Sequence, residues 1–145
     1  MRTKAETLAE IQTLFDGIAY GKAASVLRMV EAYVGPEVFR KAVNAYLEKH
    51  AYGNATAEVF WNQVAATSGK PVDKIMASFT EQSGAPLVFI KSACRANTTQ
   101  VALAQERYFA DPAKLAAESR EIWQIPVNLR PAGSKDATSR LLTRR

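Results

Sequence analysis

A break at Ser83-Gly84-Ala85-Pro86 divides the sequence into two parts with different hydrophobic periodicity. Before the break, apolar residues recur at every third or fourth position, which is typical of amphipathic helices. After it, short apolar runs and alternation of polar with apolar residues are typical of strands. Glycine and proline are the strongest local breaks in regular structure. The sequence therefore predicts an α+β fold, with a helical domain over residues 1–84 and a strand-rich domain over 85–130.

The first part is predicted to be a run of helices. Gly35 and Pro36 separate the first helix from the second, and Gly69 ends the third. Thr56 is expected to cap the third helix and Asp73 the fourth, because both side chains can accept hydrogen bonds from free amides. The expected buried stripes are Ala23, Val26, Leu27, Val30, Tyr33 and Val34; Phe39, Ala42, Val43, Tyr46 and Leu47; Phe60, Trp61 and Val64; and Ile75, Met76 and Phe79.

Strands are expected over residues 87–90, 100–105 and 123–129. Residues 111–120 are predicted to be a loop or a short helix between strands.

The formal charge of +5 is concentrated at the C-terminal end. After Pro131 the charged residues are Lys135, Asp136, Arg140, Arg144 and Arg145. The body of the chain mixes both signs, so a disordered, solvated tail over 131–145 explains the charge better than a nucleic-acid groove. Nucleic-acid binding is not predicted, because the sequence offers no recognition helix, glycine-rich loop or aromatics interleaved with basic residues.

Composition also bears on the cellular location of the protein. The single cysteine, Cys94, rules out an internal disulfide and fits a reducing environment. Charged residues such as Lys4 and Glu6 interrupt the apolar residues near the N-terminus, so neither a signal peptide nor a membrane segment is expected there. A cytoplasmic location is favoured. With 145 residues and 48% hydrophobic content, the chain is long enough for a packed core.

Several stretches of the sequence resemble one known family in the same order. They are LFDGIAYGKAASVLRM at 14–29, YLEKHAYGNAT at 46–56, SGKPVD at 68–73 and FTEQSGAPLV at 79–88. Through them the chain is similar to zinc aminopeptidases of the aminopeptidase N-like (gluzincin) family. The resemblance implies the mainly helical C-terminal part of a thermolysin-like peptidase domain, followed by the first strands of an incomplete β-sandwich.

The resemblance implies that Tyr20 is catalytic. In peptide hydrolysis a phenol, which is protonated at neutral pH, can donate a hydrogen bond to the oxygen that becomes negative in the tetrahedral intermediate. Taken alone, a tyrosine at the start of an amphipathic helix is more often a packed ring whose hydroxyl bonds a neighbour. The resemblance also places Phe15 at the entrance of the substrate pocket, with core packing as the open alternative.

Other residues near these stretches are expected to be structural. Gly17 and Gly21 are predicted to loosen the backbone on either side of the catalytic tyrosine. His50 lies at a helix end, where a cation complements the dipole, and a lone histidine forms no metal site. Tyr52 and Trp61 match aromatic positions of the family and are expected in the core.

The zinc ligands of the family are expected outside this chain. Family members hold zinc through an HExxH helix and a later glutamate, both N-terminal to the tyrosine segment. An HExxH motif needs two histidines one helical turn apart, and this sequence has only His50. The isolated chain is therefore expected to be inactive.

The predicted function is that of a fragment. It belongs to a zinc-dependent aminopeptidase that removes N-terminal residues from peptides, and it contributes Tyr20 but no zinc ligand. The expected partners are the peptide substrate and the missing N-terminal part of the catalytic domain. A non-catalytic helical module that binds another protein is the alternative, and the lack of metal ligands in the sequence supports it.

Overall fold

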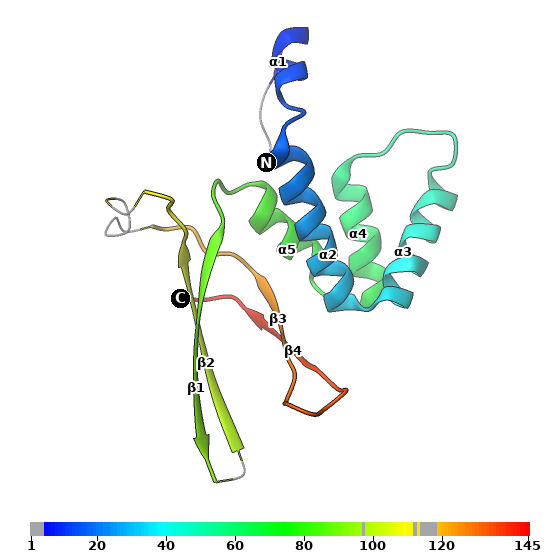
Figure 1. Cartoon of the computed structure of the whole chain (residues 1–145). Coiled ribbons are helices and arrows are strands. Elements are labelled where there is room, and N and C mark those ends of the chain that lie inside the picture. Colours follow the sequence, from blue (N-terminus) through cyan, green and yellow to red (C-terminus); the bar gives the residue numbers. More distant parts are fainter. Residues whose placement is uncertain (1–4, 97, 112, 114–118) are drawn as a thin grey trace. The chain divides into compact units, whose positions relative to one another are not determined.

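The computed structural model describes residues 5–96, 98–111, 113 and 119–145. The chain divides into two compact units, Met1–Glu81 and Gln82–Arg145. The predicted α+β class is confirmed, because the described part of the first unit is helical and that of the second carries antiparallel strands (Figure 1). The division falls after Glu81, whereas the sequence suggested a boundary after Gly84.

The first unit contains α1 (Leu8–Thr13), the π-helix η1 (Ile18–Lys22), α2 (Ala23–Val34), α3 (Pro36–Lys49), α4 (Ala57–Ser68) and α5 (Val72–Thr80). The helices expected from periodicity correspond to α2 through α5. Helix α4 packs on both α3 and α5, and α2 contacts the same two helices (Figure 1). Their buried apolar residues are Val26, Val30, Val34, Ala42, Val64, Val72, Ile75, Met76 and Phe79.

The ends of α2 and α4 are made by glycines with positive φ. Gly35 has φ +96° and Gly69 has φ +65°, which side chains rarely adopt. Pro36 follows as the first residue of α3, where its missing amide hydrogen is no loss. The Lys70 ammonium donates a hydrogen bond to the Tyr33 carbonyl and lies 4.3 Å from the Tyr33 ring centroid. The turn after α4 is therefore tied to the last turn of α2.

Two predicted caps are corrected by the structure. Thr56 is the N-cap residue of α4 in extended conformation, but its side chain accepts no hydrogen bond from the helix. Helix α5 begins at Val72 with Pro71 at the cap position, so Asp73 is not the cap. Asp73 lies instead in the first turn, where its carboxylate still complements the positive end of the helix dipole.

Aromatic rings fill the space between α3 and α4. The Phe60 ring lies 5.0 Å from Tyr46, 4.9 Å from Trp61 and 6.3 Å from Phe39, all with edge-to-face geometry. Such tilted contacts are favourable because the positive ring edge meets the negative ring face. Trp61 is half-buried at the border of this cluster.

The turn after α3 overturns one expectation. The Gly53 amide donates to the His50 carbonyl at 3.1 Å and closes the turn. Tyr52 inside it has φ +58° and a fully exposed side chain, so its interpretation as a core residue is wrong. His50 ends α3 as expected, with its ring 5.4 Å from that of Tyr46. The tight turn leaves Tyr52 exposed, whereas the nearby His50 ring contacts Tyr46.

The second unit contains two antiparallel pairs of strands. β1 (Pro86–Arg95) pairs with β2 (Thr98–Arg107), and β3 (Ile125–Leu129) pairs with β4 (Thr138–Leu142). The strands expected at 87–90 and 100–105 exist and are longer than predicted, while β3 begins two residues after Trp123. Most of the loop or short helix expected over 111–120 lies outside the described residues.

The disordered tail expected over 131–145 is a wrong prediction for Thr138–Leu142, which form β4. Leu142 pairs with Ile125 of β3, and both side chains are buried. The basic residues of the tail are typical of a solvated segment, but they lie beside the apolar residues Leu141 and Leu142. The free energy gained by burying Leu142 outweighs the preference of the neighbouring basic residues for water.

The core of the second unit is built around Trp123. This side chain is fully buried, and Ile125 and Leu142 are the other buried apolar residues described in this unit. The buried Gln105 amide pairs with the Trp123 backbone, accepting from its N–H at 2.9 Å and donating to its carbonyl at 2.8 Å. Gln82 makes the same two-bond pairing with the Ile122 backbone. Side-chain amides thus supply the hydrogen bonds that a neighbouring strand would supply in a larger sheet.

The glycine of the sequence break has a steric reason. Gly84 has φ +87°, and a Cβ there would lie 2.8 Å from Arg107 Nε. The Arg107 guanidinium is held by Glu121 and by the Ser83 hydroxyl. A larger residue would therefore meet both a strained backbone and a fixed side chain. Separately, no helix in the described ranges is long and apolar enough to cross a membrane.

Candidate active site

Tyr20 lies in the irregular first part of a long helix. The backbone is helical from Gly17 to Val34 without interruption, and residues Ile18–Lys22 form the π-helical turn η1. A π turn holds one residue more than an α turn and occurs often at functional sites. The regular helix α2 follows directly, and its buried valines anchor it in the core of the first unit.

Asp16 caps the helix that carries Tyr20. Its Oδ1 atom accepts hydrogen bonds from the Ile18 amide at 2.9 Å and the Ala19 amide at 2.8 Å. Its carbonyl accepts from the Tyr20 amide at 3.1 Å. Three consecutive amides at the helix start are therefore bonded to one residue. This role was not predicted from the sequence, although an aspartate just before a helix is a recognised cap signal.

Tyr20 and Phe15 form a pair of exposed rings. Their centroids are 6.3 Å apart with a tilt of 36°. Phe15 is 66% exposed and Tyr20 is 64% exposed, so neither side chain is packed in the core of its unit. Among the described residues, no group hydrogen-bonds to the Tyr20 hydroxyl. The structure thus brings together the two site residues expected from the sequence.

The glycines beside Tyr20 do not adopt a left-handed backbone conformation. Gly17 has φ −60° and ψ −23°, an ordinary helical conformation. Gly21 lies inside η1, and neither glycine has a positive φ. A Cβ at either position would meet no atom within 4 Å. The irregularity of the backbone here is a π turn that includes Gly21.

The Lys22 side chain near Tyr20 is half-buried. It ends η1, and burial lowers the pKa of its ammonium group from the ordinary value of 10.5. Desolvation disfavours the charged form of a lysine, which accounts for the direction. The site therefore has a partly buried cation within two residues of Tyr20 in the chain.

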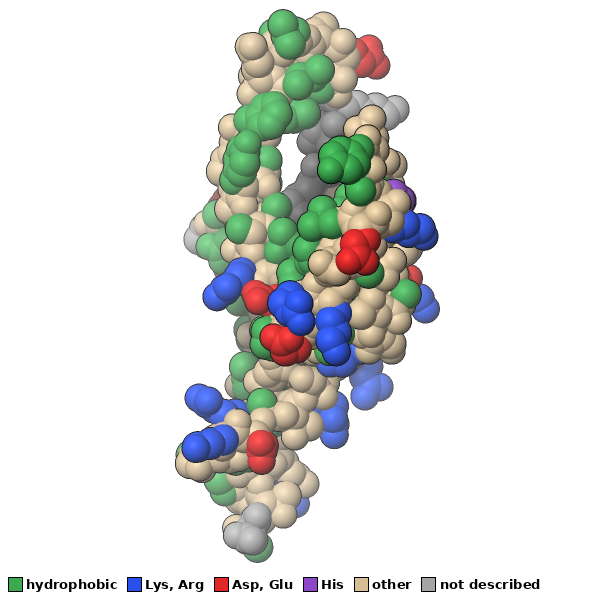
Figure 2. Space-filling view, turned by 90° about the vertical axis from the view of Figure 1, so that its right-hand side faces the viewer, with side chains coloured by type: hydrophobic (Ala, Val, Ile, Leu, Met, Phe, Trp, Pro, Cys, Tyr) green, Lys and Arg blue, Asp and Glu red, His purple; other side chains and the backbone are tan. Residues whose placement is uncertain are grey.

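Exposed apolar side chains extend from α1 through η1. We name this set the N-terminal apolar surface; its members are Leu8, Ile11, Phe15, Ile18 and Tyr20. Helix α1 has a complete capping box between Thr7 and Glu10 yet contains no buried residue. Figure 2 shows apolar side chains gathered at the upper end of the view, over α1 and η1. Contiguous apolar surface of this kind commonly marks an interaction site.

The described residues bring no set of zinc ligands together. Within the described residues, no group of three or more His, Cys, Asp or Glu side chains could hold a metal ion. His50, the one histidine of the sequence, has its Nε2 atom buried at the end of α3. Zinc in proteins needs three or four such ligands around one point.

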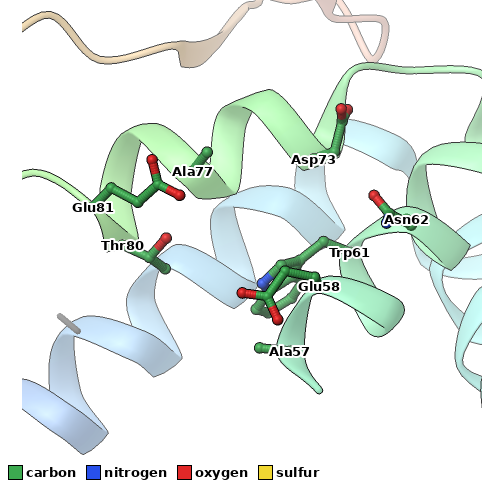
Figure 3. A pocket seen from close by; sticks show the side chains of 8 residues that line it. All are labelled: Ala57, Glu58, Trp61, Asn62, Asp73, Ala77, Thr80 and Glu81. Carbon is green, nitrogen blue, oxygen red and sulfur yellow. The ribbon is translucent and has the colours of Figure 1, made fainter. Parts of the chain in front are cut away.

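A separate pocket of about 180 Å³ opens between α4 and α5. Figure 3 places Glu58 and Trp61 of α4 across from Thr80 and Glu81 at the end of α5. Neither Tyr20 nor Phe15 lines it. The pocket is therefore distinct from the exposed ring pair, and the candidate active site rests on η1.

Comparison with known proteins identifies the family. Residues 1–79 match the Peptidase family M1 domain. The chain is 40% identical over 120 residues to tricorn protease-interacting factor F2 of Thermoplasma volcanium, a match that covers 83% of this chain and 14% of that protein. It is 39% identical over 126 residues to probable aminopeptidase 2 of Sulfurisphaera tokodaii, covering 87% and 15% of the two chains. It is 40% identical over 121 residues to aminopeptidase M1 of Arabidopsis thaliana, covering 83% and 13%.

The chain spans only 13–15% of the length of these three relatives. The matches nevertheless cover 83–87% of the chain itself. The domain match covers residues 1–79 of the 145, which is more than half of the sequence. The chain belongs to peptidase family M1.

Proposed function

We propose that this chain is the part of a zinc-dependent aminopeptidase that supplies Tyr20 to the reacting peptide bond. The observation that carries the proposal is the state of Tyr20. It is 64% exposed, it lies in a capped π turn, and no described group bonds its hydroxyl. A tyrosine kept for packing would bury its ring and pair its hydroxyl. Tyr20 instead presents a free donor on a rigid helix.

The chemistry follows from the donor. When a peptide carbonyl is attacked, its oxygen gains negative charge that was absent in the substrate. A hydroxyl held at that position donates a hydrogen bond that is stronger in the transition state than in the ground state. Only such differential binding lowers the barrier. The Tyr20 hydroxyl has the right chemistry for this role, and helix α2 gives it a fixed base.

The metal of such an enzyme would be held elsewhere. The described residues of this chain do not fit a zinc site, and we assign no step through the metal to them. We propose that the zinc ligands belong to a further segment of the complete protein. The names of two relatives, an aminopeptidase M1 and a probable aminopeptidase, agree with peptidase activity of the whole molecule.

The N-terminal apolar surface is the proposed contact for that further segment. Helix α1 has a complete capping box, but none of its residues is buried within its unit. A short, fully exposed apolar helix gains little from folding alone, because its stability comes mainly from packing. Covering Leu8, Ile11 and Ile18 by the zinc-bearing part of the catalytic domain would account for their exposure.

Phe15 is the proposed substrate contact. Its ring is exposed and lies 6.3 Å from that of Tyr20, so a peptide whose carbonyl reaches Tyr20 would pass close to it. Apolar walls beside a few polar groups are usual for ligand sites. Phe15 would then line the entrance of the pocket for a peptide substrate.

The test is Tyr20→Phe in a complete enzyme that contains this segment. The substitution removes only the hydroxyl, so folding and metal content should stay close to those of the unmodified enzyme. Turnover should fall by about a hundredfold to a thousandfold, or about 3 to 4 kcal/mol, with little change in the Michaelis constant. The measurement is steady-state hydrolysis of an aminoacyl substrate.

Tyr52→Phe is the matched control, because Tyr52 is fully exposed in the turn after α3 and has no place in the site. It should leave turnover unchanged. Near-normal turnover of Tyr20→Phe would overturn the proposed function. In that case the exposed apolar surface would favour the alternative, a helical module that binds another protein without catalysis.

A further inference from the structure

Asp16 is the residue through which the backbone around Tyr20 is held. Its Oδ1 atom bonds the amides of Ile18 and Ala19, and its carbonyl bonds the amide of Tyr20. The first amides of a helix have no partner within the helix. Without a cap they would bond to water, and the first turn would fray. Asp16 therefore closes the end of the helix next to the proposed catalytic side chain.

The π turn makes this cap more important than an ordinary one. Helix α2 is anchored by buried valines, but η1 has no buried residue. Core packing thus fixes the helix from Ala23 onward, whereas no residue of Ile18–Lys22 is fully buried. Another local bond comes from the Ser25 hydroxyl to the Gly21 carbonyl at 2.9 Å. On the N-terminal side of Tyr20, Asp16 bonds the amides of Ile18, Ala19 and Tyr20.

We propose that Asp16 is a positioning residue for Tyr20, acting through the hydrogen-bond acceptor of its carboxylate and not through its charge. The inference rests on the proposed function of Tyr20. Correct placement of a catalytic group is worth a large share of its effect, and a shift of about 1 Å can cost about a hundredfold in rate. Loss of the cap would let Tyr20 sample other positions without removing its hydroxyl.

The first test uses the 145-residue chain and no enzyme activity. Asp16→Ala should speed hydrogen exchange at the Ile18, Ala19 and Tyr20 amides by about tenfold, because a cap is worth roughly that factor in helix stability. Exchange at α3 to α5 should not change. Asp16→Asn keeps an acceptor at the same place and should restore protection to within about twofold. Unchanged exchange in Asp16→Ala would overturn the proposal.

The second test uses a complete enzyme that contains the segment. Asp16→Ala should lower kcat by about tenfold with little change in KM, and Asp16→Asn should stay within about twofold of the unmodified enzyme. Glu37→Ala is the matched control, because Glu37 is also an exposed carboxylate in the first turn of a helix, α3. It should leave kcat unchanged. An Asp16→Asn enzyme as impaired as Asp16→Ala would show that the charge matters and would overturn the proposal.

A double substitution separates this inference from the function on which it rests. If Asp16 acts only by placing the Tyr20 hydroxyl, Asp16→Ala should cost nothing further, within about twofold, in a Tyr20→Phe enzyme. A tenfold loss that persists in that background would overturn the positioning role while leaving the role of Tyr20 intact. Normal turnover of Tyr20→Phe alone would overturn the proposed function instead. Normal turnover of Asp16→Ala beside an impaired Tyr20→Phe would overturn only the inference.

Discussion

The helical unit and the strand unit differ in which side chains they bury and in how their backbone hydrogen bonds are satisfied. The helical unit buries aliphatic and aromatic side chains from α2 to α5, and each helix satisfies its own backbone hydrogen bonds. The strand unit buries Trp123 and relies on the Gln105 and Gln82 amides to satisfy the backbone beside it. Most residues of β1 and β2 are exposed. The core helices thus satisfy their backbone hydrogen bonds internally, whereas the small sheets depend on individual polar side chains.

The largest effect that would test this difference is expected from Trp123→Ala. The side chain is fully buried, and truncation of a buried tryptophan costs about 3 to 5 kcal/mol. With so small a core, the strand unit should unfold. Helical circular dichroism and slow amide exchange at Val30 and Val64 should remain. Loss of both units together would show that they fold as one body and would break the comparison.

Trp123→Phe is the milder partner of that variant. It keeps an aromatic ring but removes the Nε1 group, which is buried without a hydrogen-bond partner among the described residues. Because an unpaired buried donor is itself costly, this change should destabilise the unit far less than truncation to alanine.

The converse variant is Ile75→Ala in the helical unit. Ile75 is fully buried on α5, and the substitution should cost about 2 to 5 kcal/mol through lost burial and a cavity. Thermal unfolding should shift for the helices, with the exchange rates of Ile125 and Leu142 unchanged. Ile75→Val should cost only about 0.5 to 1.5 kcal/mol. Equal losses from the two variants would contradict a tightly packed helical core.

A smaller effect is expected from Gln105→Ala. The change leaves the Trp123 amide and carbonyl buried without partners, at a cost of about 1 to 3 kcal/mol. Denaturant unfolding of the strand unit, followed by Trp123 fluorescence in a Trp61→Phe background, measures the loss. Gln100→Ala on the same strand is the control, because Gln100 is exposed. If both variants unfold alike, the side-chain pairing carries no special weight.

The smallest effect is expected on acidification. The Glu6 and Thr7 amides donate to the Glu10 carboxylate and lower its pKa below the usual 4.5. The stabilisation of α1 is therefore present above pH 4.5 and is lost as the pH falls through the lower folded value. Amide exchange in α1 should rise a few-fold at about pH 3, while the buried helices α2 to α5 keep their protection.

Glu10→Gln is the control for the acid effect. Glutamine can still accept hydrogen bonds from the amides at the helix start, but it does not titrate. Exchange in α1 of this variant should be independent of pH after correction for intrinsic rates. A pH dependence equal to that of the unmodified chain would assign the effect to another carboxylate.

Much of the helical unit was readable from the sequence because burial there is periodic. Val26, Val30 and Val34 repeat every four residues, and Gly35 and Gly69 mark helix ends that only glycine adopts easily. Tyr52 was misassigned because its position depends on a tight turn and not on hydrophobicity. Strand β4 was missed for a related reason. Its pairing with β3 is a contact between distant parts of the unit, and the basic residues around it suggested a solvated tail.

The candidate site was predictable only in part. The family resemblance pointed to Tyr20 and Phe15, and the structure places their rings close together. The π turn was not predicted, because one extra residue in a helical turn leaves no mark in hydrophobic periodicity this close to a helix start. The cap by Asp16 could have been found from residue type alone, since aspartate is among the preferred residues before a helix.

The extra residue in η1 has a consequence for how chains of this kind tolerate changes in length. In a regular helix each residue advances the side-chain direction by about 100°. Deleting Gly21 or Lys22 would shorten the segment between Tyr20 and α2 by one residue and change the direction of Tyr20 relative to the buried face of α2. A deletion in the exposed connection between α3 and α4 would change no such direction. The length of η1 therefore sets the direction of a side chain, whereas the length of the α3–α4 connection only has to join two helix ends.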